Sequence, residues 1–193
     1  MESICLATNN AHKIEEIRAI LGARFQLLSL ADIGCTEELP ETADTIPGNS
    51  RQKAEYVFHR YQVACVADDS GLEIGALSDA PGVHSAYYGG SQRSHAANIQ
   101  RVLSELAGNP RRAARFRTVL TWVSAQRTEV FEGILKGTII EEPRGGNGFG
   151  YDPIFLPEGY TRTLAELSPA EKNAMSHRAQ AVQKFAKFLS SGV

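Results

Sequence analysis

Five small apolar residues at 63–67, Val-Ala-Cys-Val-Ala, are followed directly by Asp68-Asp69-Ser70-Gly71. An apolar run this short, without polar alternation, is typical of a strand that is buried on both faces. The acidic and glycine-containing sequence after it is typical of a turn, so we expect the strand to stop at Asp68. The run therefore predicts a sheet with a buried strand.

The rest of the chain alternates between helical and extended patterns. Apolar residues at helical spacing and short apolar runs give the following prediction. We expect strands at 3–7, 25–30, 63–67, 115–124 and 128–140, and helices at 11–21, 49–61, around 99–106 and around 182–189. Parallel-type units come first and antiparallel strands follow, which predicts one mixed α/β domain over residues 1–193 without a separable linker.

Composition excludes several classes of protein. The chain has 20 basic and 22 acidic residues, a balance that argues against binding to nucleic acid or to an anionic membrane. Its three cysteines, Cys5, Cys35 and Cys65, lie in or beside apolar stretches and are expected to be inert core thiols. Without a signal peptide or a long apolar run, we expect a cytoplasmic protein.

The first candidate site is Thr8-x-Asn10-x-x-Lys13, where a strand leads into a helix. Unpaired N–H groups and the dipole make a helix start an anion site, and Lys13 adds a positive charge that suits a phosphate. Alternatively, Asn10 only caps the helix and Lys13 is solvated.

The second candidate site is the pair Asp68 and Asp69, with Glu41 as a further candidate ligand. Carboxylate oxygens at a strand end suit Mg²⁺ and leave one acid to activate water. Adjacent strand residues point to opposite faces, so at most one of the two aspartates faces a given side unless a turn rotates them. Two solvated carboxylates in a turn are the alternative.

The third and fourth candidate sites lie in the last third of the chain. In the glycine-rich segment 145–153, Phe149 and Tyr151 offer surfaces for stacking a flat base, and Asp152 offers an acceptor. Further on, Ser168-Pro169-x-Glu171 predicts a capped helix. If Ser176 starts another helix, Lys172, His177 and Arg178 could converge on one ligand; otherwise they are solvated charges on two ordinary helices.

Together these segments resemble the inosine/xanthosine triphosphate pyrophosphatase family. The resemblance is carried by Thr8-x-Asn10-x-x-Lys13, ADDSGL (67–72), APGVHSA (80–86), GFGYDPIF (148–155) and AELSPAEKNAMSHRAQA (165–181). It implies hydrolysis of ITP, dITP and XTP to the monophosphate and pyrophosphate, with Mg²⁺ required. It also implies a long twisted mixed sheet with flanking helices that form two lobes around a central cleft, and a homodimer.

The resemblance assigns roles to individual residues. Asp69 is the expected general base and a metal ligand, with Asp68 and Glu41 as further Mg²⁺ ligands. The expected phosphate contacts are Thr8, Asn9, Asn10, Ala11, His12, Lys13 and Lys53. The other expected substrate contacts are Ser70, Phe149, Gly150, Tyr151, Asp152, Lys172, His177 and Arg178. Many bacterial relatives have arginine at the position of Tyr87 and glutamate at the position of Gly48, so this chain departs from the family there.

Two other functions remain open at this stage. A Maf-type pyrophosphatase would act on other nucleotides, and a regulatory protein would bind a nucleotide without hydrolysing it. The Ser-His-Arg sequence at 176–178 argues against the first, and the retained pair Asp68 and Asp69 argues against the second.

Overall fold

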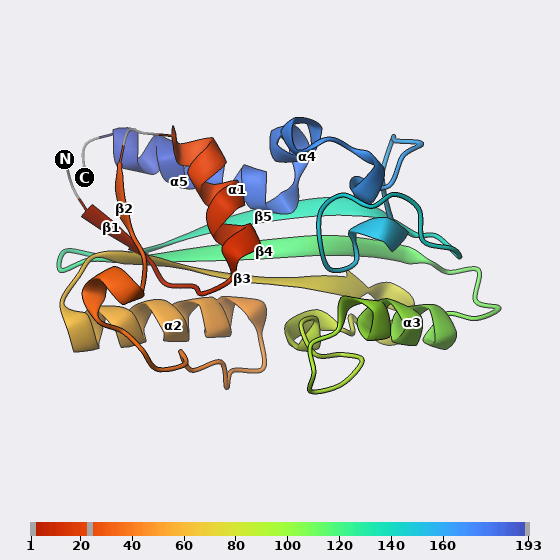
Figure 1. Ribbon diagram of the computed structural model, residues 1–193, viewed down its shortest axis with the longest axis horizontal. Helices are drawn as coiled ribbons and strands as arrows, with labels where there is room; N and C mark the ends of the chain where they lie inside the picture. Colours follow the sequence, from red (N-terminus) through yellow and green to blue (C-terminus); the bar gives the residue numbers. More distant parts are fainter. Residues whose placement is uncertain (1–2, 23–24, 192–193) are drawn as a thin grey trace. The chain divides into compact units, whose positions relative to one another are not determined.

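The computed structural model of the protein describes residues 3–22 and 25–191 (Figure 1). The chain forms two compact units. Unit 1 comprises Met1–Asp69, Thr118–Gly133 and His177–Val193, and unit 2 comprises Ser70–Arg117 and Ile134–Ser176. The chain therefore passes from one unit to the other several times, and the strands of the middle region contribute residues to both.

Six strands pair in the order β2-β1-β3-β4-β5-β6. They are β1 (Ser3–Leu6), β2 (Gln26–Leu28), β3 (Cys65–Ile74), β4 (Ala113–Val123), β5 (Thr128–Ile139) and β6 (Phe155–Pro157). Strand β1 runs parallel to both β2 and β3, whereas β5 and β6 are antiparallel. The predicted mixed α/β class, with parallel units early in the chain, is confirmed.

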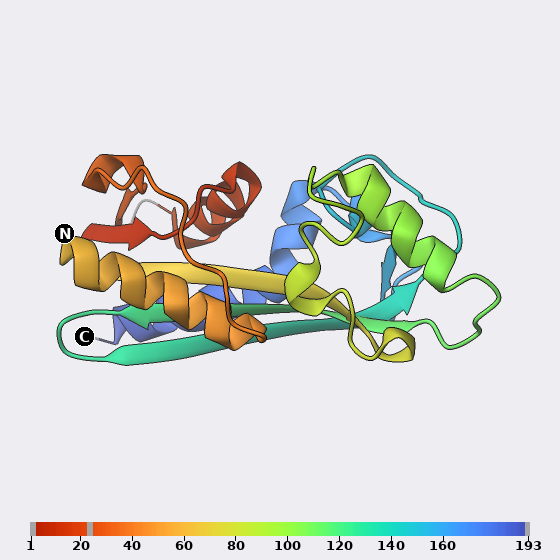
Figure 2. The same ribbon diagram turned by 90° about the horizontal axis from the view of Figure 1, so that it is seen from below.

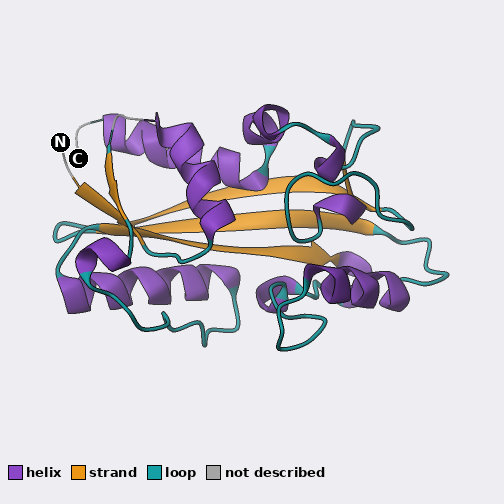
Figure 3. Ribbon diagram, viewed as in Figure 1, coloured by secondary structure: helices purple, strands orange, loops and turns teal. Residues whose placement is uncertain are grey.

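Five α-helices accompany these strands in the described part of the chain (Figure 3). They are α1 (Ala11–Leu21), α2 (Ile46–Tyr61), α3 (His95–Glu105), α4 (Pro169–Met175) and α5 (His177–Ser190). Short 3₁₀ helices lie at Ala31–Ile33, Gly75–Leu77, Gly82–His84, Asp152–Ile154 and Leu164–Glu166.

In unit 1, alternate side chains of β1 and β3 enter two different cores. Leu6 and Val66 pack with α1 and α5, whereas Cys5 and Cys65 pack with α2. Figures 1 and 2 show α2 on one side of these strands and α5 on the other. Because successive strand residues point to opposite faces, this alternation also determines the face on which each later residue of β3 lies.

The cysteines are core residues, as predicted. Cys5, Cys35 and Cys65 are buried with free thiols in the core on the α2 side. Burial raises the pKa of the Cys5 and Cys65 thiols to about 12, so neither is a reactive thiolate near neutral pH.

Local sequence signals set the ends of the first two helices. Asn10 caps α1 by accepting a hydrogen bond from the Lys13 N–H, and Gly22, at φ 64°, follows the last turn as predicted. Helix α2 begins at Ile46, three residues before the predicted start at Asn49. The earlier start follows from a side-chain cap by Thr45 and a proline in the first turn.

Strand β3 is longer than the sequence indicated. It does not stop at Asp68 but continues through both aspartates to Ile74. The expected turn is therefore wrong, and Asp68 and Asp69 lie in the middle of a strand whose residues up to Asp69 are buried. Their place within regular extended structure means that their side chains must point to opposite faces.

Unit 2 has its own core. Leu72 and Ile74 of β3 pack with Val102 and Leu106 of α3, and Phe155 of β6 joins the same cluster. Helix α4 is capped by Ser168 and Glu171 as predicted and ends at Met175, and Ser176 separates it from α5, which starts at His177.

Within residues 3–22 and 25–191, none of the helices combines the length and the apolar character needed to cross a membrane.

Candidate active site

The two aspartates of β3 belong to different charge clusters within unit 1. Asp68 has the same strand parity as Val66 and therefore faces α1 and α5, whereas Asp69 faces α2. Both are buried, with exposed fractions of 1% and 8%. Strand alternation thus separates two acids that are adjacent in sequence.

The Asp68 cluster is a buried network of two carboxylates and two cations. Asp68 forms ion pairs with Lys13 of α1 and with Arg178 of α5, and the Arg178 Nε lies 3.0 Å from Asp68 Oδ2. Arg178 also forms an ion pair with Glu16 of α1. Two cations from two helices therefore hold the Asp68 carboxylate in place.

The Asp69 cluster is built around one ammonium group. Lys53 of α2 donates a hydrogen bond of 2.8 Å to the backbone carbonyl of Asp68 and lies 3.3 Å from Asp69 Oδ1. Its Nζ also forms an ion pair with Glu41. Three oxygen atoms from a strand and a loop therefore meet at one cation.

Burial and neighbouring charges shift the pKa values of the two aspartates in opposite directions. Burial opposes ionisation of Asp68, but Lys13 and Arg178 hold the pKa of its carboxyl well below the usual range. Burial dominates at Asp69 and raises the pKa of that carboxyl despite Lys53 and Lys13. Asp68 is thus a fixed anion, while Asp69 is the more basic of the two, which suits a general base.

The chemistry of the Asp69 cluster fits a hard divalent cation. No group of three His, Cys, Asp or Glu side chains with metal-ligand spacing occurs among the described residues. The carboxylates of Glu41 and Asp69 and the carbonyl of Asp68 nevertheless converge on one ammonium. These are the oxygen ligands that Mg²⁺ prefers, whereas the carboxylate of Asp68 faces the other side of the strand.

The segment between β1 and α1 presents backbone groups at a helix start. Thr8 accepts a hydrogen bond from the Asn10 N–H, and Asn10 accepts one from the Lys13 N–H. Three of the predicted phosphate contacts, Asn9, Ala11 and His12, lie exposed on this segment. Asn10 is thus a helix cap, whereas Lys13 is no solvated surface residue because its side chain is only 14% exposed.

The loop that carries Glu41 is anchored to α2 by Glu37. The Glu37 carboxylate accepts hydrogen bonds of 2.9 Å from the hydroxyls of Tyr56 and Tyr61, and it forms an ion pair with Arg60 at 2.8 Å. Hydrogen bonds from the backbone N–H of Glu37, from Tyr61 and from Tyr56 lower the pKa of this carboxyl to about 2. The ionised form of Glu37 thus fixes one end of the loop.

We expect Glu37→Gln to lower the melting temperature at pH 7 and to lose this effect in acid. A carboxyl whose pKa is depressed in the folded state adds stability above its unfolded pKa of 4.5 and loses it as the pH falls towards 2. Melting curves from pH 7 down to pH 2 should therefore converge for the two proteins. Glu38→Gln is the matched control at an exposed neighbour, and equal melting curves at pH 7 would show that Glu37 adds no stability.

In unit 2, Asp152 and Lys172 organise the glycine-rich loop. Asp152 Oδ2 accepts hydrogen bonds from the Phe149 N–H at 2.9 Å and from Lys172 Nζ at 2.7 Å. Lys172 Nζ also lies 4.8 Å from the centre of the Phe149 ring. Gly148 has φ +75°, and a Cβ there would lie 2.1 Å from Asp152 Oδ2, so the loop requires glycine at this position.

The two aromatic residues of this loop have different environments. Phe149 is half-buried and can offer a ring face, and the Gly150 N–H beside it donates to His95 Nδ1 at 3.4 Å. Tyr151 is buried in the core of unit 2 and donates a hydrogen bond to the Ser85 carbonyl at 2.8 Å. Phe149 is therefore the better candidate for base stacking, whereas Tyr151 anchors the loop to the core of unit 2.

The remaining predicted contacts divide between the units. Ser70 is half-buried and follows Asp69 in β3, in unit 2. His177 starts α5 in unit 1 and is 5% exposed. Gly133 allows β5 to approach this helix start, because a Cβ there would lie 1.9 Å from the His177 carbonyl oxygen.

Two polar partners of the predicted site, Glu16 and His95, were not among the predicted site residues. Glu16 lies one turn after Lys13 on α1, so the spacing Lys13-x-x-Glu16 was a usable signal that both occupy one helix face. His95 had no signal, because its contact with Gly150 joins residues 55 positions apart.

The two departures from the family pattern have different surroundings. A Cβ at Gly48 would lie 2.7 Å from Ala43 Cβ and 2.8 Å from Thr45 Oγ1, so glutamate there would require the preceding loop to move. Tyr87 is 40% exposed, and its hydroxyl lies 2.9 Å from His84 Nδ1.

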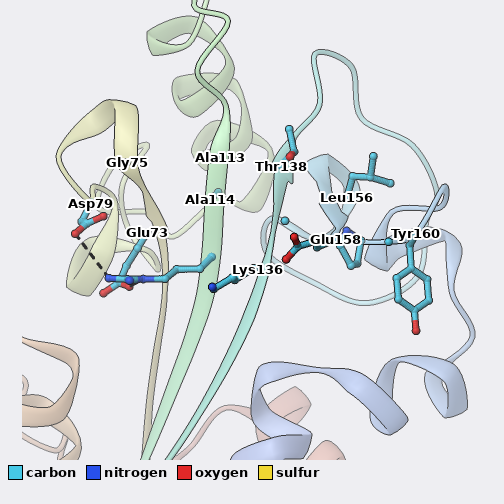
Figure 4. Close-up of a pocket in the computed structure, with 14 residues that line it drawn as sticks. Glu73, Gly75, Asp79, Ala113, Ala114, Lys136, Thr138, Leu156, Glu158 and Tyr160 are labelled. Atoms are coloured by element: carbon cyan, nitrogen blue, oxygen red, sulfur yellow. Dashed lines mark hydrogen bonds and ion pairs between the residues drawn. The ribbon is translucent and has the colours of Figure 1, made fainter.

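A separate hollow of about 600 Å³ lies within unit 2 and is lined by residues of β3, β4, β5 and β6 (Figure 4). Its charged lining residues are Glu73, Asp79, Arg115, Lys136 and Glu158. Arg115 already forms ion pairs with Glu73 and Asp79. Carboxylates outnumber cations in this hollow, which disfavours a triphosphate.

Comparison with known proteins places these features in a family. The sequence model of the Ham1 family matches residues 4–188. The chain is 49% identical to the dITP/XTP pyrophosphatase of Porphyromonas gingivalis, over 98% of both chains. It is 46% identical to the dITP/XTP pyrophosphatase of Bacillus subtilis, over 99% of this chain and 98% of that protein. The solved structure of the Staphylococcus aureus Ham1 protein superposes with a TM-score of 0.93 at 33% identity and covers all of both chains. Matches of this extent in both sequence and fold show that the chain belongs to the Ham1 family.

Proposed function

We propose that this protein hydrolyses deaminated purine nucleoside triphosphates, namely ITP, dITP and XTP, to the monophosphate and pyrophosphate. The names of its relatives support the reaction and the substrate class. The observation that carries the assignment is the gathering of Glu41, Asp69 and the Asp68 carbonyl around a single cation position. We treat both units as one functional domain, acting in the cytoplasm as a homodimer.

The residues of unit 1 are assigned to the triphosphate and the metal. Glu41, Asp69 and the Asp68 carbonyl would hold Mg²⁺, which supplies positive charge to the phosphate oxygens when bound. Lys13 and the backbone N–H groups at the start of α1 bind the phosphate chain. Asp69 accepts the proton of the attacking water, since it is the β3 aspartate whose carboxylate lies at the proposed metal position.

Cleavage between the α- and β-phosphates builds negative charge on the leaving pyrophosphate. The protein contributes mainly by positioning and by fixed positive charge, as in other phosphoryl transfers. Lys13 is suited to this task because Asp68 and the start of α1 already hold it in place.

Base selectivity is assigned to donors that meet the purine 6-position. Hypoxanthine and xanthine have an oxygen acceptor there, and adenine has an amino donor. Backbone N–H groups, His177 or Arg178 therefore favour the oxo-purines and leave unpaired donors against adenine. A buried mismatch of this kind can be worth on the order of 10⁴-fold. The loop from Phe149 to Asp152, with Lys172, is assigned to the nucleoside, with Phe149 as the stacking surface.

The test is product analysis with purified protein, Mg²⁺ and ITP, XTP, ATP, GTP or TTP in separate reactions. We expect pyrophosphate from ITP and XTP and none from ATP. Preferential turnover of TTP would favour the Maf-type alternative. Nucleotide binding without turnover would favour a regulatory protein, and orthophosphate as the first product would exclude the proposed cleavage.

We expect His177→Ala to reduce discrimination between ITP and ATP more than it slows ITP cleavage. His177 is buried at the start of α5, where a lost donor costs the oxo-purine a contact and removes a mismatch for adenine. The readout is the ratio of kcat/KM for ITP and ATP, with His59→Ala on the exposed surface of α2 as the control. An unchanged ratio would remove His177 from base recognition.

A further inference from the structure

Lys53 stands where a bound metal ion would be expected. Its side chain is 6% exposed, and its Nζ contacts Glu41, Asp69 Oδ1 and the Asp68 carbonyl. An ammonium group has three N–H donors, so these contacts satisfy all of them. The position is thus a complete oxygen-lined site for a cation, and a lysine from the protein fills it.

An ammonium and Mg²⁺ compete for oxygen atoms of this kind. Both are compact, strongly hydrated cations that prefer carboxylate and carbonyl oxygens. Glu41 and Asp69 cannot keep the same close contacts with Lys53 while they also bind a divalent ion, because the two cations would repel each other strongly at that separation.

We propose that Lys53 is the resident counter-ion of the metal site and is exchanged for Mg²⁺ when the metal binds. This inference rests on the proposed function in taking Glu41 and Asp69 as metal ligands. The exchange moves the positive charge of Lys53 away from the metal ligands and does not neutralise it. Lys53 is in this sense a positioning residue that keeps the metal ligands assembled before the metal arrives.

The surroundings of Lys53 allow such a movement. The Glu41 side chain is 43% exposed and lies in a loop, so one of the three contacts can open towards solvent. The lysine side chain is a flexible chain of four carbons, and rotation about its bonds lets the ammonium leave the carboxylates without a shift of α2. The displaced charge is then available to the phosphate chain, so metal and triphosphate binding should favour each other.

The inference predicts that Lys53→Gln binds Mg²⁺ more tightly than the wild type. Removing the competing charge should increase the affinity for Mg²⁺ alone, without nucleotide, by about tenfold. Without metal, the same variant should melt at a lower temperature, because Glu41 and Asp69 lose their counter-ion. Adding Mg²⁺ should then raise its melting temperature more than that of the wild type.

The measurement is calorimetric titration of the metal-free full chain with Mg²⁺. Arg51→Gln is the matched control, since it removes one positive charge from the same helix at a side chain that is 63% exposed and paired only with Glu55 among the described residues. Lys53→Arg keeps a positive charge that can pair bidentately with carboxylates, so it should bind Mg²⁺ no more tightly than the wild type. This variant tests the exchange even if Lys53→Gln fails to fold.

The outcomes separate this inference from the proposed function. Tighter Mg²⁺ binding by Lys53→Gln, with Arg51→Gln unchanged, supports the exchange. Equal or weaker binding by Lys53→Gln, tighter binding by Lys53→Arg, or no Mg²⁺ binding by any of the proteins overturns it. Pyrophosphate release from ITP by the wild type is measured in parallel and decides the proposed function independently.

Discussion

Asp69→Asn should reduce pyrophosphate release from ITP by roughly 10³-fold while nucleotide binding remains measurable. General-base catalysis contributes about 10²–10⁴-fold in enzymes, and asparagine keeps the shape of the side chain without its proton-accepting oxygen. Asp69 is the acid of β3 whose pKa burial raises, and it lies beside the proposed metal ligand Glu41 at the same ammonium. Its loss should therefore affect both the base and the metal site.

Steady-state release of pyrophosphate and calorimetric binding of ITP give the two readouts. Asp79→Asn is a suitable control because it neutralises a carboxylate that is 62% exposed and 3.8 Å from Arg115 in unit 2. A surface ion pair of this kind contributes little, so this variant should keep the wild-type rate. Full activity of Asp69→Asn would remove Asp69 from the mechanism.

Elements with local signals could be predicted from the sequence. Helix α1 was predicted with its observed ends because the Asn10 cap and Gly22 lie within a few residues of it. A new helix after Ser176 was one of two predicted alternatives, and the structure confirms it, since α4 and α5 are separate helices. In both cases neighbouring residues determine the backbone conformation without help from distant parts of the chain.

Strand β3 could not be predicted correctly because its polar residues depend on distant partners. Two aspartates followed by serine and glycine have the composition of a turn. They remain extended because Lys13, Lys53 and Arg178 supply positive charge from three different helices. Arg178 lies 110 positions from Asp68 in sequence, and no local pattern reveals such a contact.

The candidate site also combines features that the sequence indicates with features that depend on distant contacts. The strand end and the polar loop indicated Asp69 and Glu41, and the family resemblance added Lys53 as an expected phosphate contact. The structure gathers these three side chains in one cluster. The rule that adjacent strand residues face opposite sides also applied to Asp68 and Asp69. The burial of Tyr151 was not predictable, because the glycine-rich sequence around it does not reveal which ring enters the core.

Asp68→Asn should lower the free energy of unfolding by about 3–5 kcal/mol, since removal of one partner from a buried ion pair leaves an uncompensated charge. Asp68 is 1% exposed, and the side chains of Lys13 and Arg178 are 14% and 2% exposed, so water cannot replace the lost carboxylate at Arg178. Glu16 still pairs with Arg178, which leaves Lys13 as the cation most affected. Chemical denaturation at pH 7 measures this loss directly.

A double-mutant cycle separates the cost of leaving a buried cation uncompensated from the cost of a general packing defect. Lys13→Met removes one of the cations that Asp68 compensates, so the double variant Asp68→Asn/Lys13→Met should be more stable than the sum of the two single losses predicts. The residual cost should then fall mainly on Arg178, which loses Asp68 and retains its ion pair with Glu16. Strict additivity would mean that Lys13 and Asp68 do not stabilise each other. Lys13 would then be held near the start of α1 by the helix and not by the Asp68 carboxylate.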